Sequence, residues 1–152
     1  MRAGTFKFLE NWKIETVDAY TGEVLDVEEK CNTIVNDGLE RVAKLINGVS
    51  STYFRALAIG TGTTDAVAGD TSLETEYTRA LATLAYEASY KATFTKTFTF
   101  ASGTSENITE AGVFDSATAS GSNMLARTTF TAKAITGDVS LIVTATITVA
   151  RV

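Results

Sequence analysis

The chain has 152 residues, enough for one domain or at most two very small ones. Its 13 basic and 18 acidic residues give a formal charge of −5, which disfavours binding to the phosphate backbone of nucleic acid. Histidine is absent and cysteine occurs once, which excludes nucleophile systems with an imidazole base, internal disulfides and cysteine-based zinc clusters.

Threonine occurs 26 times in the sequence, beside eight Phe and five Tyr. Threonine and aromatic side chains suit a pleated, half-buried surface, so the composition favours β-sheet. The sequence has no apolar run long enough for a signal peptide or for the roughly 20 residues of a membrane span. We therefore expect a protein that is made in a cytoplasm and has no membrane partner. We interpret residues 1–152 as a single domain, with an N-terminal hairpin or arm over residues 1–31 and a helix plus β-sandwich over residues 32–152.

The first predicted element is a hairpin over Asn11–Val27. Apolar and polar residues alternate along its first half, and Ala19–Gly22 supplies a turn. The run Glu23–Val27 then returns along the first half, so the segment is expected to pair with itself as two antiparallel strands.

One amphipathic helix is predicted at about residues 33–47. Its apolar stripe has helical spacing and consists of Val35, Leu39, Val42 and Ile46. Asn32 or Thr33 can cap the first turn, because a short side-chain oxygen accepts hydrogen bonds from its unpaired amides. Asn47-Gly48 is a stop signal. Gly38 inside the helix marks either a close approach to a sheet or an irregular first turn.

Alternation of apolar and polar residues predicts β-strands through most of the remaining chain. The runs that carry it are Phe54–Ile59, Tyr90–Phe100, Ile108–Phe114, Met124–Thr131 and Val139–Val149. Lys96 interrupts an otherwise apolar face and must reach solvent or a carboxylate. Long strands joined by loops of Gly, Ser and Asn are typical of an antiparallel β-sandwich. The predicted fold class is therefore mainly β, of α+β character, with one helix and an N-terminal hairpin.

Two features of these runs have more than one interpretation. The uniformly apolar face of Val139–Val149 indicates either a central core strand or a surface partly buried against another subunit. The threonine-rich faces suit either water or the sheet of a neighbouring subunit, because threonine offers both a methyl and a hydroxyl group. Between the strands, Thr71-Ser72-Leu73-Glu74 has the form of a capping box and predicts a single helical turn.

The segment Gly60-Thr61-Gly62 follows a predicted strand and resembles the start of a phosphate-binding loop. Such a loop needs Lys-Ser/Thr after its glycines, and a dinucleotide loop needs a third glycine that opens a long helix. Here Thr63-Thr64-Asp65 follows instead, and the Asp65 carboxylate would repel phosphate. We therefore interpret the segment as a structural turn.

Four acidic residues crowd the next loop: Asp65, Asp70, Glu74 and Glu76. Carboxylate oxygens of this kind can hold calcium, but the alternating acidic spacing of a calcium loop is absent. Asp70 and Glu74 are better explained as groups that cap a helix and interact with its dipole. Whether the Asp65–Glu76 region binds a cation stays open at this point.

Three further carboxylates, Glu106, Glu110 and Asp115, are close in sequence and could serve glycoside hydrolysis if they faced one another. The single tryptophan, Trp12, is far away in sequence, and nothing places these carboxylates in an aromatic cleft. Cys31 has no neighbouring base, so we expect a small buried apolar side chain rather than a nucleophile. The sequence thus predicts no catalytic, cofactor-binding or metal-binding residue, and no enzyme.

Five segments in one order carry a family resemblance. They are Asn32–Leu39, Leu57–Thr64, Asp70–Glu76 with Arg79, Ile108–Asp115 and Met124–Phe130. Together they resemble small structural proteins of tailed bacteriophages, of the kind labelled tail-fibre, tail-associated or head-decoration proteins. The resemblance covers about residues 32–149 and leaves out the N-terminal hairpin.

The resemblance implies a non-enzymatic, oligomeric component of a phage virion, with capsid decoration as the first interpretation and a tail-fibre, tail-tip or neck role as the alternative. The implied partners are further copies of the chain, as a trimer or other ring, and the major capsid protein or tail proteins. A second alternative is a carbohydrate- or host-surface-binding module, in which Tyr20, Tyr53 and Tyr77 would stack on a sugar.

Overall fold

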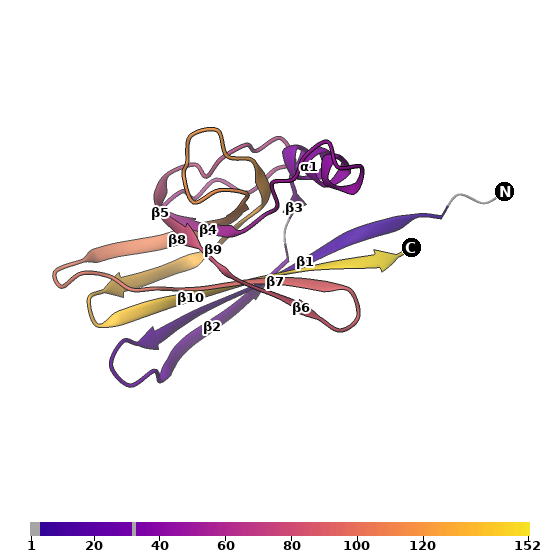
Figure 1. Cartoon of the computed structure of the whole chain (residues 1–152). Coiled ribbons are helices and arrows are strands. Elements are labelled where there is room, and N and C mark those ends of the chain that lie inside the picture. The colour runs from indigo at the N-terminus through magenta and orange to yellow at the C-terminus, as the bar shows by residue number, and fades with distance from the viewer. Residues whose placement is uncertain (1–3, 32) are drawn as a thin grey trace.

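The computed structural model describes residues 4–31 and 33–152, which form two antiparallel five-stranded sheets and one helix (Figure 1). The first sheet contains, in spatial order, β2 (Val24–Lys30), β1 (Phe6–Asp18), β10 (Val139–Arg151), β7 (Lys91–Phe98) and β6 (Thr83–Glu87). The second contains β3 (Thr33–Ile34), β9 (Met124–Thr136), β8 (Ser105–Phe114), β4 (Ala56–Gly60) and β5 (Glu76–Leu81). The helix α1 spans Asn36–Ile46. The predicted sandwich with one helix and an N-terminal hairpin is confirmed.

The main core lies between the two sheets. On β10 the inward residues are Leu141, Val143, Ala145 and Ile147, which are buried, while Thr144, Thr146 and Thr148 alternate with them on the other face. Because β10 pairs with β1 on one side and β7 on the other, the prediction of a central core strand is confirmed. A second, smaller apolar cluster involves the second sheet and its loops and contains Val35, Ala56, Ala58, Leu73, Phe114 and Met124.

The predicted hairpin is present as β1 and β2, and it belongs to the first sheet. β1 pairs with β10 over its whole length, from Phe6 opposite Arg151 to Asp18 opposite Val139. The N-terminal strand is therefore an interior strand of the sandwich rather than an arm attached to it. β2 covers its other side and forms one edge of the sheet.

The helix is shorter than predicted. It begins at Asn36, after the two-residue strand β3, and its N-cap is Val35 without a side-chain hydrogen bond. The Thr33 cap is therefore wrong, because this residue pairs with Arg127 in the second sheet; the alternative cap, Asn32, lies outside the described residues. Gly48 ends the helix region with a φ of 75°. At Gly38, an added Cβ would lie 2.5 Å from the carbonyl oxygen of Leu125, so the close approach to a sheet is confirmed.

Other local predictions need correction. The capping box at residues 71–74 forms no helical turn, because the Glu74 carboxylate accepts hydrogen bonds from Thr64 instead of folding back onto its own segment. The edge strands β5 and β6 were not assigned from sequence, since their exposed or half-buried positions lack a clear alternation. Lys96 is half-buried on the β7 strand that it interrupts.

An ion-pair cluster joins the two sheets along one side of the sandwich. The Lys133 ammonium of β9 is buried and lies 2.7 Å from carboxylate oxygens of Asp26 and of Glu28 on β2. Hydrogen bonding to Lys133 lowers the pKa of Asp26. Burial raises the pKa of Glu28, but hydrogen bonds from Lys133 and from Thr131 outweigh it, so the net pKa is lowered. Burial lowers the pKa of Lys133, and the two carboxylates more than compensate, so its net pKa is raised.

This cluster makes stability depend on pH in a defined direction. A carboxylate with a lowered pKa stabilises the fold above its ordinary pKa and loses that contribution as the pH falls through the lowered value. We expect Lys133→Met to lower the urea midpoint at pH 7, and the difference from the parent protein to shrink below about pH 4. Lys13→Met, which removes an exposed ion pair with Glu15, is the matched control and should show little difference at either pH. A Lys133→Met deficit that persists unchanged at pH 3 would contradict this account.

Candidate functional site

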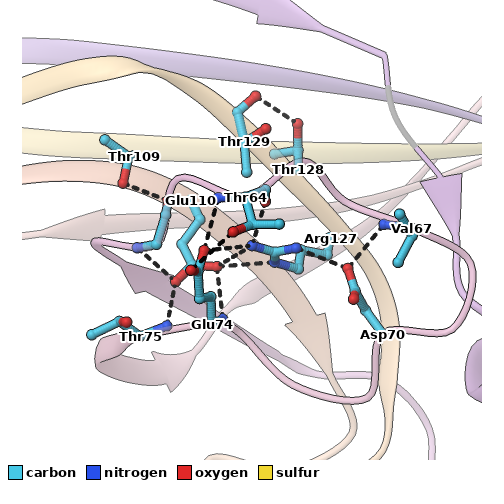
Figure 2. Close-up of polar contacts among 11 residues, drawn as sticks. Thr64, Val67, Asp70, Glu74, Thr75, Thr109, Glu110, Arg127, Thr128 and Thr129 are labelled. Carbon is cyan, nitrogen blue, oxygen red and sulfur yellow. Dashed lines mark hydrogen bonds and ion pairs between the residues drawn. The ribbon is translucent and has the colours of Figure 1, made fainter.

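The most buried charged pair in the described chain is Glu110 on β8 with Arg127 on β9. Their side chains are 0% and 3% exposed, and Nε of Arg127 donates to Oε2 of Glu110 at 2.9 Å (Figure 2). A buried carboxylate and a buried guanidinium are costly unless each is fully paired and hydrogen-bonded. The surrounding loop supplies those partners.

Three backbone amides of the loop that follows β4 point at the Glu110 carboxylate. Gly62 and Thr75 donate to Oε1 at 2.9 and 2.8 Å, and Glu74 donates to Oε2 at 3.0 Å. An added Cβ at Gly62 would lie 2.5 Å from Oε1 of Glu110, so only glycine lets the backbone come this close. The glycine-rich turn therefore does bind an anionic group, but the anion is the protein's own carboxylate.

The Arg127 guanidinium holds the far part of the same loop. It donates to Oδ2 of Asp70 at 2.8 Å and to the carbonyl oxygen of Thr64 at 2.9 Å. Burial lowers the pKa of Arg127, but hydrogen bonds to Asp70 and Glu110 outweigh it, so the net pKa is raised and the charge is retained. Hydrogen bonds from the Thr64 amide and hydroxyl lower the pKa of Glu74. We call Thr64, Asp70, Glu74, Glu110 and Arg127 the carboxylate–arginine hub.

The hub contains two of the four acidic residues considered as cation ligands, Asp70 and Glu74. Asp70 binds Arg127, and Glu74 accepts a hydrogen bond from Thr64. Their assignment as helix caps is therefore wrong. Glu76 instead forms a two-bond ion pair with Arg79, with both distances 2.6 Å, and Asp65 is exposed. Among the described residues, no group of three or more Asp, Glu, Cys or His is arranged to hold a metal ion.

The carboxylates considered for hydrolysis do not share a cleft. Glu106 is exposed, and Glu110 belongs to the hub. Asp115 is buried, accepts hydrogen bonds from the backbone and side chain of Asn123, and pairs with Arg41 of α1 at 3.1 Å. Glu110 and Asp115 therefore each hold a loop in place.

Two other sequence expectations concern Cys31 and three tyrosines. Cys31 is exposed, so the prediction of a buried apolar side chain is wrong; it directly follows the edge strand β2, where the chain leaves the first sheet. The three tyrosines considered for sugar stacking lie on separate elements. Tyr20 bonds to Asp138, Tyr53 stacks with Arg55, and Tyr77 packs against Phe100.

The second notable feature is an apolar groove between α1 and the start of β1. Its volume is about 560 Å³, and its lining residues are Phe6, Lys7, Phe8, Ile34, Leu39, Val42, Ala43 and Ile46. Figure 1 shows the ends of β1 and β10 reaching beyond the second sheet on the side where α1 lies. The inner face of the first sheet is thus left partly uncovered there, and Ile46 of the helix is 74% exposed.

A second groove, of about 430 Å³, continues from the first through the shared residues Phe8 and Val42. It adds Tyr86 from β6, Tyr90 from the β6–β7 turn and Val149 from β10. Each groove has one charged lining residue, Lys7 in the first and Lys91 in the second. We call the combined surface of Phe6, Phe8, Leu39, Val42, Ile46, Tyr86, Tyr90 and Val149 the open-end surface.

Sequence reasoning missed the open-end surface for an identifiable reason. The helical spacing of Leu39 and Ile46 predicts an apolar stripe, and in the structure these side chains are 45% and 74% exposed. Periodicity reports an apolar face but not what covers it. The one available signal was the aromatic run at Phe6–Phe8, which precedes the predicted hairpin and has no obvious partner in the sequence.

Comparisons of the chain with protein-family models, with curated proteins and with solved structures found no match. Within residues 4–31 and 33–152, no helix is long and apolar enough to cross a membrane.

From the contacts of the hub we expect one substitution, Arg127→Met, to lower the free energy of unfolding strongly. Arg127→Met leaves Glu110 buried without its cation, so we expect a loss of about 3–5 kcal/mol in the free energy of unfolding. Lys44→Met, which removes an exposed pair with Glu40 on α1, should change the free energy of unfolding very little. Urea denaturation followed by circular dichroism measures both. Equal losses for the two variants would show that the hub does not stabilise the fold in this way.

Proposed function

We propose that the chain is a non-enzymatic structural component of a tailed-phage particle, and that it decorates the capsid by binding the major capsid protein through the open-end surface. The observation that carries the proposal is this surface: a contiguous apolar region with exposed Phe6, Ile46, Tyr86 and Tyr90. Contiguous exposed apolar patches of this kind are typical of sites of protein–protein contact.

The chemistry of the two grooves supports a protein partner over a carbohydrate. A sugar site needs several polar groups that bind hydroxyls, in addition to aromatic faces. Tyr86 and Tyr90 provide aromatic faces, but Lys91 is the only charged residue that lines their groove. Apolar side chains of a protein partner fit such a surface better than a glycan does.

The burial and pairing of the hub residues also support a structural role. Glu110 and Arg127 lie inside the protein, where a substrate could not reach them, and they bind backbone groups of a loop. The motifs that resemble phage structural proteins contain hub residues, Asp70, Glu74, Glu110 and Arg127 among them. A role in the tail remains the alternative, because the resemblance includes tail-fibre and tail-associated proteins equally.

The proposal is tested by binding the purified protein to empty heads and, separately, to tails of the phage that encodes it. We expect the protein to co-sediment with heads, and Ile46→Glu to weaken this binding at least about tenfold, because the introduced carboxylate would be buried without a partner. Val67→Glu is the matched control, since Val67 is 57% exposed in the loop of the hub and lies outside both grooves.

The outcomes separate the candidate functions. Binding to tails but not heads would replace decoration with the tail role. Binding to neither particle would overturn the proposal, and retention on a glycan array that is lost in Tyr90→Ala would favour the carbohydrate-binding alternative. Equal binding by Ile46→Glu and the parent protein would show that the open-end surface is not the site.

A further inference from the structure

The two edges of the first sheet differ in how they are protected against pairing with another strand. An edge strand presents unpaired backbone groups, and natural proteins guard such edges with charges, prolines or bulges. β2 carries Asp26, Glu28, Glu29 and Lys30, and its pairing with β1 shifts register between Thr16 and Val17. This edge is guarded.

The opposite edge, β6, has one charge at its end and neither a proline nor a bulge. All five of its residues, Thr83–Glu87, are exposed, and Glu87 at its end is its only charged residue. Its pairing with β7 runs in continuous register from Thr83 opposite Thr95 to Glu87 opposite Lys91. The chain contains no proline at all. β6 is therefore a regular, nearly uncharged edge.

The side chains of β6 are suited to pairing with themselves. Leu84 and Tyr86 lie opposite Phe94 and Ala92 of β7, on the face that continues into the open-end surface. An antiparallel pair with a two-fold axis at Ala85 would place Leu84 of one copy opposite Tyr86 of the other. Cross-strand aromatic and aliphatic neighbours of this kind are stabilising.

Antiparallel self-pairing brings different charges together at the two edges, β6 and β2. With the two-fold axis at Ala85, Glu87 faces Thr83 of the second copy, so no like charges meet. The corresponding pairing of two β2 strands about Val27 would set Asp26 opposite Glu28, and directly opposed like charges are destabilising. For a chain with a net charge of −5, β6 is thus the edge of the first sheet that can approach its own copy with less repulsion.

We propose that two copies of the chain pair antiparallel along β6, with the two-fold axis at Ala85, so that their first sheets join into one continuous sheet. The proposal goes beyond the role in the phage particle, because it concerns the isolated protein. The paired edge is only five residues long, so the dimer should depend on concentration. Its apolar face would extend the open-end surface of one copy toward that of the other.

The test uses a cysteine at the two-fold position. In a Cys31→Ser background, Ala85→Cys would place two Cα atoms about 4.5–5.5 Å apart across the interface, within the range of a disulfide. Mild oxidation should then link most of the protein into dimers. Ala117→Cys, an exposed alanine in the loop after β8, is the matched control and should stay largely monomeric under the same conditions.

A second variant tests the interface without a covalent bond. Ala85→Lys would set two ammonium groups opposite each other, and we expect it to weaken the dimer at least about tenfold in sedimentation equilibrium, whereas Ala117→Lys should not. A protein that is monomeric at all concentrations would overturn the proposal. So would a trimer or larger ring that Ala85→Lys leaves intact. Dimers without binding to heads or tails would refute the proposed function alone, and particle binding by a monomer would refute the pairing alone.

Discussion

The fold depends on one constraint: the Glu110 carboxylate is completely buried between β8 and the loop that follows β4, so its oxygens need hydrogen-bond partners there. Glu110 is stable there because three loop amides and one guanidinium satisfy its oxygens. The same guanidinium reaches Asp70 and Thr64, so a single arginine fixes a loop that has no helix or strand of its own. Satisfied buried networks of this kind are rigid because each member would be costly to leave unpaired.

The fold class was predictable, because long strands with period-two alternation dominate the C-terminal half. The residues that the charged side chains and the glycine-rich turn contact across the fold were not predictable. Gly60-Thr61-Gly62 was recognised as a structural turn, but the anion that it holds comes from Glu110, 48 residues after Gly62. Arg127 lies within the alternating pattern of β9, and that pattern does not reveal which carboxylate it meets. Which charged groups meet is decided by strand order, and local sequence contains no information on that order.

The same limit applies to surfaces. The sequence marks one face of α1 and one face of β10 as apolar, yet the inward face of β10 is buried against the second sheet while Leu39 and Ile46 remain exposed. Similarly, β2 and β6 are both short edge strands, but they differ in charge. A nearly neutral edge lies next to an uncovered apolar end, whereas the acidic edge is tied by Lys133 to the second sheet. The nearly neutral edge and the exposed apolar side chains therefore lie next to each other in the sandwich.

The full-length pairing of β1 with β10 has a practical consequence. Because Phe6 lies opposite Arg151, both ends of the described chain emerge together beside α1, as Figure 1 shows. A purification tag or fluorescent domain fused at either terminus would crowd that region, whichever terminus is chosen. The exposed turn between β1 and β2, residues 19–23, lies at the opposite end of the β1–β10 pairing from Phe6 and Arg151, so it offers an insertion point for a label away from both termini.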